Sequence, residues 1–142
     1  MDKSQFDIVV IGELNPDLIL KGNVVPEFGQ VEKLVDQATL QIGSSSAIFA
    51  CGAARLGLRV AFIGKLGADL FGRFMKDSLE RHGINTEGII IDREIPTGIS
   101  VILSMGQDRA ILTYQGTIAS LKADEINGEI IRVSRHLHIG SY

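Results

Sequence analysis

Residues 40–69 read LQIGSSSAIFACGAARLGLRVAFIGKLGAD, and this stretch decides the fold class. A β-rich run ends at Gly43, three serines follow, and residues 47–56 form a small-residue helix pattern that Gly57 closes. A serine hydroxyl can accept from the free N–H groups of a first helical turn, and glycine commonly follows the last helical residue. The stretch therefore predicts a strand, a tight turn and a helix, with hydroxyls and backbone N–H groups at the turn where a polar ligand can bind.

The same stretch continues into a second strand, because an apolar run ends at Gly64 and Gly67. Asp69 then precedes an amphipathic segment and is expected to cap it as a helix. Apolar runs and amphipathic segments alternate along the rest of the chain, which is typical of an α/β fold with a parallel sheet. The predicted strands are 6–11, 18–20, 34–42, 60–63, 89–91, 98–105, 109–114 and 136–139, with a turn at 85–88, and the predicted helices are 47–56, 69–82 and 122–131.

Composition narrows the class of protein. The chain has 142 residues, 45% of them hydrophobic and 22% charged, which fits one soluble globular domain. A net charge of -3 gives no support to a nucleic-acid partner, which usually requires a basic surface. Cys51 is the single cysteine and cannot form an internal disulfide, and no apolar run approaches the about 18–20 residues of a membrane span. The cytoplasm is the expected compartment, with no membrane partner.

Two polar residues follow the first predicted strand. Asn15 and Asp17 lie just after it, in the sequence Gly-Glu-Leu-Asn-Pro-Asp. Ligands of open α/β sheets bind beyond the carboxyl ends of the strands, so both side chains are candidate ligand contacts. An asparagine before a proline also forms Asx-type turns, and spacing alone does not separate these two interpretations.

Two blocks of sequence carry a family resemblance. GSSSAIFACGAARLG at 43–57 is similar to a Gly-Gly-x-x-x-Asn turn that opens a helix ending in Ala-Arg-Leu-Gly, and VAFIGKLGADLFG at 60–72 contains Gly-x-x-Gly-x-Asp-x-Phe-Gly. Both resemble the amino-terminal signature of the ribokinase-like (PfkB) carbohydrate kinases. The resemblance runs from Ile8 to about Gly140 and covers nearly the whole chain.

The resemblance implies an α/β, ribokinase-like fold, in which helices flank a parallel sheet and a small β-sheet forms a lid over a sugar. Residues 1–142 would then be the amino-terminal part of one α/β domain, with lid strands contributed by about 18–42 and 97–115. The carboxyl-terminal half of the fold would be absent. A small sheet packed on one face leaves apolar surface exposed, so a homodimer formed lid to lid is expected.

The resemblance also implies a set of ligand-facing residues. In the family, the Asn-x-Asp after the first strand faces the sugar, and a carboxylate suits this task because it accepts several charge-assisted hydrogen bonds. The residues expected to contact a sugar or polyol are Asn15, Asp17, Gly43, Ser44 and Ser45. Arg109, on the predicted lid hairpin, either reaches an acidic ligand or is a solvated surface arginine.

Two positions depart from the family pattern. Ser44 stands where the family has its second glycine, and Ile48 stands where it has asparagine. A serine adds a side chain where backbone approaches the sugar, and isoleucine can neither donate nor accept a hydrogen bond. Three explanations remain open: the ligand differs from a common sugar, the serines replace the lost contacts, or binding has been lost.

The chemical machinery of a kinase is missing from the sequence. Sugar phosphorylation needs a base, groups that neutralise phosphate charge, and usually Mg²⁺. The chain contains neither a Walker A pattern nor the Gly-Ala-Gly-Asp stretch that supplies these groups in the family. ATP and Mg²⁺ are implied for a full-length family member, and this portion is expected to bind neither and to be inactive alone.

Two other classes of protein compete with a kinase. Gly43-Ser44-Ser45-Ser46-Ala47 fits a loose nucleophile elbow, in which Ser45 would attack, His136 or His138 would act as base and Asp124 would orient it. No glycine-rich oxyanion-hole stretch precedes this turn, which weighs against a serine hydrolase. The other class is a non-catalytic module that binds a ligand or dimerises.

Overall fold

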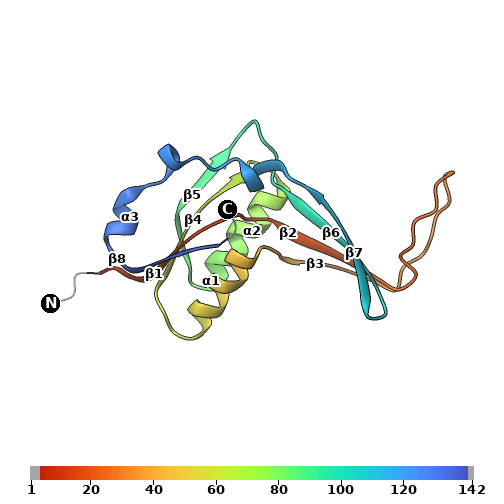
Figure 1. Cartoon of the computed structure of the whole chain (residues 1–142), viewed down its shortest axis with the longest axis horizontal. Coiled ribbons are helices and arrows are strands. Elements are labelled where there is room, and N and C mark those ends of the chain that lie inside the picture. Colours follow the sequence, from red (N-terminus) through yellow and green to blue (C-terminus); the bar gives the residue numbers. More distant parts are fainter. Residues whose placement is uncertain (1–3, 141–142) are drawn as a thin grey trace.

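The computed structural model describes residues 4–140 and shows two separate sheets (Figure 1). The main sheet has four parallel strands in the order β5-β4-β1-β8. Their bounds are Phe6–Ile11 for β1, Val60–Gly67 for β4, Asn85–Asp92 for β5 and Ser134–Ile139 for β8. Strand β4 is buried along its whole length, as expected for a central strand of a parallel sheet.

Helices cover both faces of the main sheet. The helices are α1 (Ser45–Arg55), α2 (Leu70–Arg81) and α3 (Gly128–Arg132). Alternate residues of β1 point to opposite faces. Val10 packs in a cluster with Ala47 of α1 and Met75 of α2, whereas Val9 packs in a second cluster with Ile130 of α3. The core therefore lies on both sides of the sheet, and alanines let α1 approach it closely.

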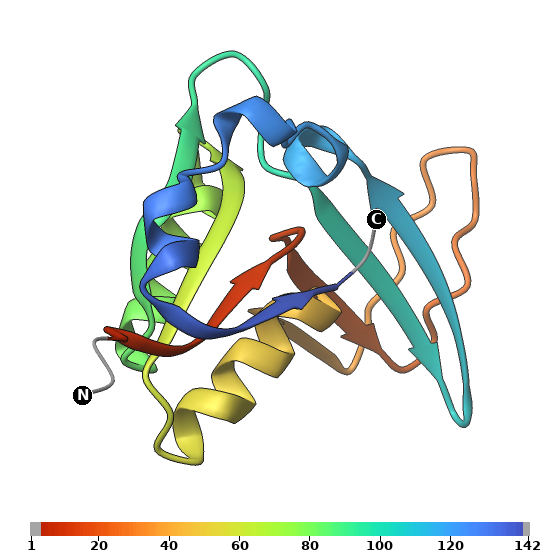
Figure 2. The same cartoon turned by 60° about the vertical axis from the view of Figure 1, so that its left-hand side comes forward.

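The second sheet, here called the lid sheet, projects to one side of the main sheet (Figures 1 and 2). Its order is β3-β2-β6-β7, with β2 and β6 parallel and the outer pairs antiparallel. The bounds are Pro16–Lys21 for β2, Gln37–Ile42 for β3, Ile99–Met105 for β6 and Asp108–Tyr114 for β7. Loop 22–36 extends beyond the sheet, and every residue of β7 is exposed.

The predicted fold class is confirmed, and several boundaries are corrected. Strand β4 continues through Gly64 and ends at Gly67, so the prediction that the strand stops at residue 63 is wrong. A Cβ at Gly64 would lie 2.9 Å from the backbone oxygen of Gly12, and a Cβ at Gly67 would lie 2.5 Å from the backbone nitrogen of Thr97. Both glycines permit close approach of another segment of backbone, and Gly64 does so inside the strand without ending it.

Three further predictions need correction. Strand β5 includes the predicted turn at 85–88, because its register with β4 extends back to Asn85. Strand β3 begins at Gln37 and not at residue 34. The predicted helix 122–131 is two short elements, a 3-10 turn η2 (Ala123–Glu125) and α3, which follow another 3-10 turn, η1 (Gly116–Ala119). Asn127 separates the two, since its Oδ1 accepts from Glu129 N at 3.0 Å and starts a new helix.

The two predicted helix caps are confirmed. Ser44 caps α1, with its Oγ accepting from Ala47 N at 3.2 Å, and Asp69 caps α2, with Oδ1 accepting from Gly72 N at 2.8 Å. Cys51 is free and buried. Within residues 4–140, no helix combines the length and the apolar character needed to cross a membrane.

Candidate functional site

Two chain reversals meet at the base of the lid sheet. The backbone N–H of Gly43 donates to Asn15 O at 3.0 Å. Pro16, the first residue of β2, pairs with Ile42, the last residue of β3. A side chain at Gly43 would collide with the carboxylate of Asp17. The two reversals therefore lie side by side, and glycine at position 43 is what lets the Asp17 carboxylate lie against the turn.

Asp17 has an unusual environment for a carboxylate on a small sheet. Asn15 is only 6% exposed, and its Nδ2 donates to Asp17 Oδ1 at 3.4 Å. Partial burial raises the pKa of Asp17, and the positive charge of Arg109 opposes this rise in part. A carboxylate that has lost hydration in this way can accept hydrogen bonds from a bound ligand.

Ser44 adopts a backbone conformation that favours glycine. Its φ of 67° lies in the left-handed region, which costs an L-residue about 1–2 kcal/mol. The hydroxyl offsets part of this cost, because it accepts from Ala47 N and donates to Glu13 O at 2.6 Å. Backbone geometry at this position thus explains the glycine of the family pattern. Serine is conformationally less favourable here, but its hydroxyl caps the helix.

Glu13 is a site residue that sequence reasoning missed. Its Oε1 accepts from Ser44 Oγ at 3.2 Å and from Ser45 Oγ at 3.4 Å, and its Oε2 accepts from Ser46 Oγ at 3.4 Å. The carboxylate also lies at the amino terminus of α1, where the helix dipole favours negative charge. Glu13 therefore anchors the serine turn to the end of β1, and its only signal in the sequence is a carboxylate just after a predicted strand.

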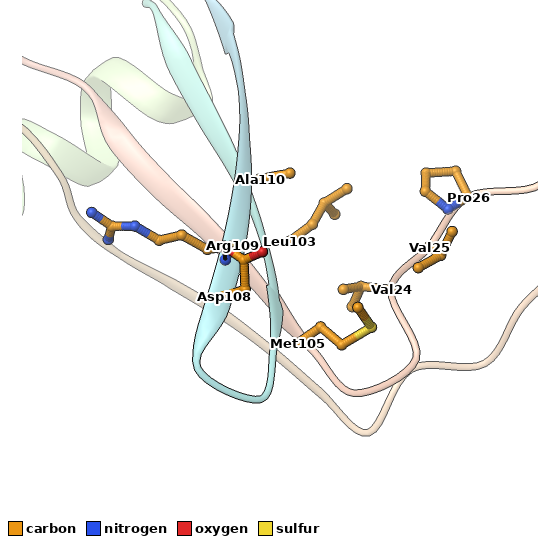
Figure 3. A pocket seen from close by; sticks show the side chains of 8 residues that line it. All are labelled: Val24, Val25, Pro26, Leu103, Met105, Asp108, Arg109 and Ala110. Carbon is orange, nitrogen blue, oxygen red and sulfur yellow. Dashed lines mark hydrogen bonds between the residues drawn. The ribbon is translucent and has the colours of Figure 1, made fainter.

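The other residues singled out from the sequence are Ser45, Ile48 and Arg109. Ser45 is exposed beside Glu13, and Ile48 is 57% exposed on the first turns of α1. Arg109 lies on β7, and its guanidinium points to the side of the hairpin away from Leu103 and Ala110 (Figure 3). The structure brings Asn15, Asp17, Gly43 and Ser44 together, places Ser45 next to them, and keeps Arg109 on the lid.

A second set of contacts, here called the lid attachment, joins the lid hairpin (β6 and β7) to the main sheet. Asp69 Oδ2 accepts from Thr97 N at 2.7 Å, and Gly67 N donates to Thr97 Oγ1 at 2.8 Å. Hydrogen bonds from backbone N–H groups, including that of Gly72, lower the pKa of Asp69 against the opposing effect of burial. One carboxylate thus fixes both the start of α2 and the segment that enters β6.

The central strand β4 carries a buried lysine with two acidic neighbours. Lys65 on β4 is 5% exposed, and its Nζ lies 2.5 Å from Glu125 Oε1 and 3.8 Å from Asp92 Oδ2. The ion pair holds η2 over the end of β4, beside a cavity of about 680 Å³. Residues 4–140 contain no cluster of three or more His, Cys, Asp or Glu side chains that could hold a metal ion.

The hydrolase arrangement is not favoured by these contacts. Ser45 Oγ donates to Glu13, and the ring of His138 stacks on Phe49 with centroids 3.8 Å apart and an interplanar angle of 16°. His136 is exposed on β8, and Asp124 lies on the separate turn η2. These groups serve local structure and do not form a chain from Ser45 to a base.

Comparison with known proteins identifies the family. The sequence profile of the pfkB family carbohydrate kinases matches residues 5–141. The 5-dehydro-2-deoxygluconokinase 2 of Bacillus cereus is 34% identical over 137 residues, which cover 94% of this chain and 40% of that protein. The probable fructokinase-5 of Arabidopsis thaliana is 34% identical over 102 residues, covering 70% of this chain and 32% of that protein.

Solved structures agree with this result. The fructokinase of Halothermothrix orenii has a TM-score of 0.78 and 30% identity, covering 94% of this chain and 45% of that one. The Arabidopsis thaliana ribokinase complexed with ribose and ATP shares the fold, with a TM-score of 0.82 and 21% identity over 94% of this chain and 45% of its own. The chain belongs to the pfkB family of carbohydrate kinases and has the ribokinase-like fold. It spans about a third to two fifths of the length of the curated relatives it matches.

Proposed function

We propose that this chain is the sugar-binding and lid part of a kinase that transfers the ATP γ-phosphate to a hydroxyl of a sugar or similar polyol. Residues 1–142 form the amino-terminal part of one α/β domain in this proposal. The observation that carries it is the meeting of Asn15 and Asp17 with Gly43 at the base of the lid sheet, in a chain of a carbohydrate kinase family. The proposed ligand contacts are Asn15, Asp17, Gly43, Ser44, Ser45 and Arg109.

The chemistry of these groups suits a polyhydroxylated ligand. The carboxylate of Asp17 accepts from two hydroxyls, the amide of Asn15 both donates and accepts, and the exposed hydroxyl of Ser45 does the same. Ile48 contributes apolar surface at the position of the family asparagine. The ligand therefore loses one polar contact in this proposal and gains others from the serine turn.

ATP and Mg²⁺ belong to the proposed whole protein. The sugar kinase PH1459 of Pyrococcus horikoshii, which is 28% identical to this chain, was solved in complex with ATP. The metal does not fit the described residues, which lack a suitable acidic cluster, and no phosphate-binding glycine stretch occurs in the sequence. We derive no phosphoryl-transfer step from this portion, and we propose that it binds neither cofactor and is inactive alone.

Ligand-induced thermal stabilisation of the 142-residue chain tests the proposal. A ligand that binds the folded state alone raises stability by about 2.7 kcal/mol at one hundred times its Kd. For a chain of this size, this corresponds to a rise in Tm of roughly 5–10 °C. We expect such a rise with at least one member of a panel of ketoses, aldoses, sugar acids and nucleosides. No shift with any of them, at concentrations up to tens of millimolar, would remove the basis for the proposal.

The proposed partner in solution is a second copy of the chain, bound lid to lid. Every residue of β7 is exposed, and Leu112 at 61% and Tyr114 at 54% lie on the face of the strand opposite to Arg109. Loop 22–36 adds Phe28 at 100% and Leu34 at 85%. Exposed apolar side chains gathered on one part of a protein are typical of an interface.

A charged substitution on the lid tests the dimer. We expect Leu112→Glu to convert the dimer to a monomer, because it buries a carboxylate in an apolar interface. Light scattering after gel filtration measures the mass, and Leu58→Glu is the control, since Leu58 is 40% exposed and lies outside the lid sheet. A wild-type chain that is monomeric at all concentrations tested would contradict the dimer.

The cytoplasm is the proposed compartment. The sole cysteine, Cys51, is free and buried, as in proteins of reducing compartments.

A further inference from the structure

One face of the lid sheet carries the polar residues of the site. Strand residues alternate between the two faces of a sheet, so Asp17, Ile19 and Lys21 of β2 share a face. The register aligns Asp17 with Ser100 and Lys21 with Ser104 on β6. The opposite face carries Leu103, Met105 and Ala110 beside Val24 and Pro26 and lines a small cavity of about 250 Å³ (Figure 3).

Three rows of residues cross the polar face from strand to strand. The row nearest the main sheet is polar, the middle row is apolar, and the outer row carries two cations. The rows are Gln41–Asp17–Ser100–Thr113, then Thr39–Ile19–Ile102–Ile111, then Gln37–Lys21–Ser104–Arg109. In the first row, the hydroxyls of Ser100 and Thr113 lie 2.9 Å apart.

The two cations of the outer row have no acidic partner among residues 4–140. Neither the ammonium of Lys21 nor the guanidinium of Arg109 takes part in an ion pair or side-chain hydrogen bond there. The adjacent carboxylate of Asp108 accepts from the backbone N–H of Arg109 at 2.8 Å and lies on the other face. The strand register places Arg109 on the same face of the lid sheet as Asp17, the proposed hydroxyl acceptor.

The order of the rows matches an elongated ligand with unlike ends. Hydroxyls at one end meet the acceptors of the first row, a C–H surface lies on the isoleucines, and the far end meets Lys21 and Arg109. Adjacent rows on one face are two residues apart, so the acceptor and cation rows are separated by about 13 Å along the strands. A long arginine side chain shortens this span, and its fork suits carboxylate and phosphate alike.

We propose that the substrate of this site is an anionic polyol, a sugar acid or sugar phosphate, whose charged end is held by Arg109 and Lys21 of the lid. The inference rests on the proposed function, because it concerns the same site, and it selects among the substrates that this function allows. Arg109 is then a specificity-determining residue. If it were only a solvated surface arginine, its substitution would leave the preference for anionic ligands unchanged.

Calorimetric titration of the chain with three probes tests the inference. The probes are D-gluconate, D-fructose 6-phosphate and neutral D-fructose, at low and at physiological ionic strength. We expect at least one anionic probe to bind ten times more tightly than D-fructose, and the preference to fall as salt screens the exposed cations. Preference for gluconate assigns a sugar acid, preference for the phosphate assigns a sugar phosphate, and both support the inference.

The variants Arg109→Gln and Lys21→Gln separate specificity from folding. Each is expected to reduce the anionic preference, measured as the Kd for D-fructose divided by the Kd for the anionic probe, about tenfold while leaving the ligand-free Tm within error. Arg55→Gln is the matched control, since Arg55 is an exposed arginine in the last turn of α1, outside the lid sheet. D-fructose binding as tightly as both anions, or a preference unchanged by Arg109→Gln, overturns the inference and leaves the proposed function intact. No binding of any probe overturns both.

Discussion

Asp17→Asn is expected to weaken sugar binding by roughly 10- to 150-fold. Hydrogen bonds to a charged group contribute about 1.5–3 kcal/mol each, and 1.4 kcal/mol corresponds to a tenfold change in Kd. Asparagine keeps the shape of the side chain but replaces one acceptor by a donor and removes the charge. Titration with the tightest-binding sugar of the panel measures the loss.

The same variant should behave differently in the absence of ligand. Partial burial raises the pKa of Asp17, so the ionised carboxylate is disfavoured in the folded state. A carboxyl whose pKa rises on folding destabilises the fold at pH values above its unfolded pKa, and this effect disappears as pH falls below that range. We therefore expect Asp17→Asn to raise the Tm of the free chain slightly at pH 7, with the difference shrinking toward pH 3.

Asp124→Asn is the control for Asp17, because Asp124 is an exposed carboxylate on η2 outside the lid sheet. It should leave both binding and Tm unchanged. If Asp17→Asn bound the sugar with wild-type affinity, as the Asp124→Asn control is expected to do, Asp17 would not be a ligand contact.

Gly72→Ala is expected to destabilise the chain by about 1–3 kcal/mol, the usual cost of overpacking a tight interior. A Cβ at Gly72 would collide with the backbone oxygen of Gly67 and would lie 3.0 Å from Thr97 Oγ1. Both are parts of the attachment between α2 and the lid hairpin, and a backbone oxygen cannot move away without shifting β4. Urea denaturation measures the loss of unfolding free energy.

Gly52→Ala provides a matched comparison in the other long helix. A Cβ at Gly52 has no heavy atom within 4 Å, so the substitution only restricts the unfolded chain. We expect it to stabilise the chain by about 0.5–1 kcal/mol, the usual advantage of alanine over glycine inside a helix. Equal effects of the two substitutions would show that the contact between α2 and the lid attachment is loose and that close packing does not require glycine at position 72.

Local patterns predicted much of this fold correctly because the physics that sets them is local. Caps such as Ser44 and Asp69 act within one helical turn, and β-rich runs such as that of β1 mark buried strands. The errors fall where distant contacts override local preference. Gly64 looks like a strand end in the sequence, yet it lies inside β4, where the backbone of Gly12 packs against it.

The residues of the candidate site also differ in whether local sequence or remote contacts reveal them. Asn15, Asp17 and the glycine turn were identified from their positions after strands and from the family resemblance. The role of Glu13 was not, because its three serine partners lie 31 to 33 residues away in the sequence. The left-handed φ of Ser44 was equally hidden, since the residue type alone favours an ordinary N-cap.

The sequence by itself determined the α/β class, the helix caps, the lid hairpin and the family of this protein, since each depends on residues within a short segment or on a motif of fixed spacing. Only the tertiary structure decided that Glu13 holds the serine turn, that Asp69 fixes the lid attachment, and that Lys21 and Arg109 share a row with no acidic partner among residues 4–140. These arrangements depend on strand register and on contacts between remote segments, and a single sequence does not record which remote groups meet.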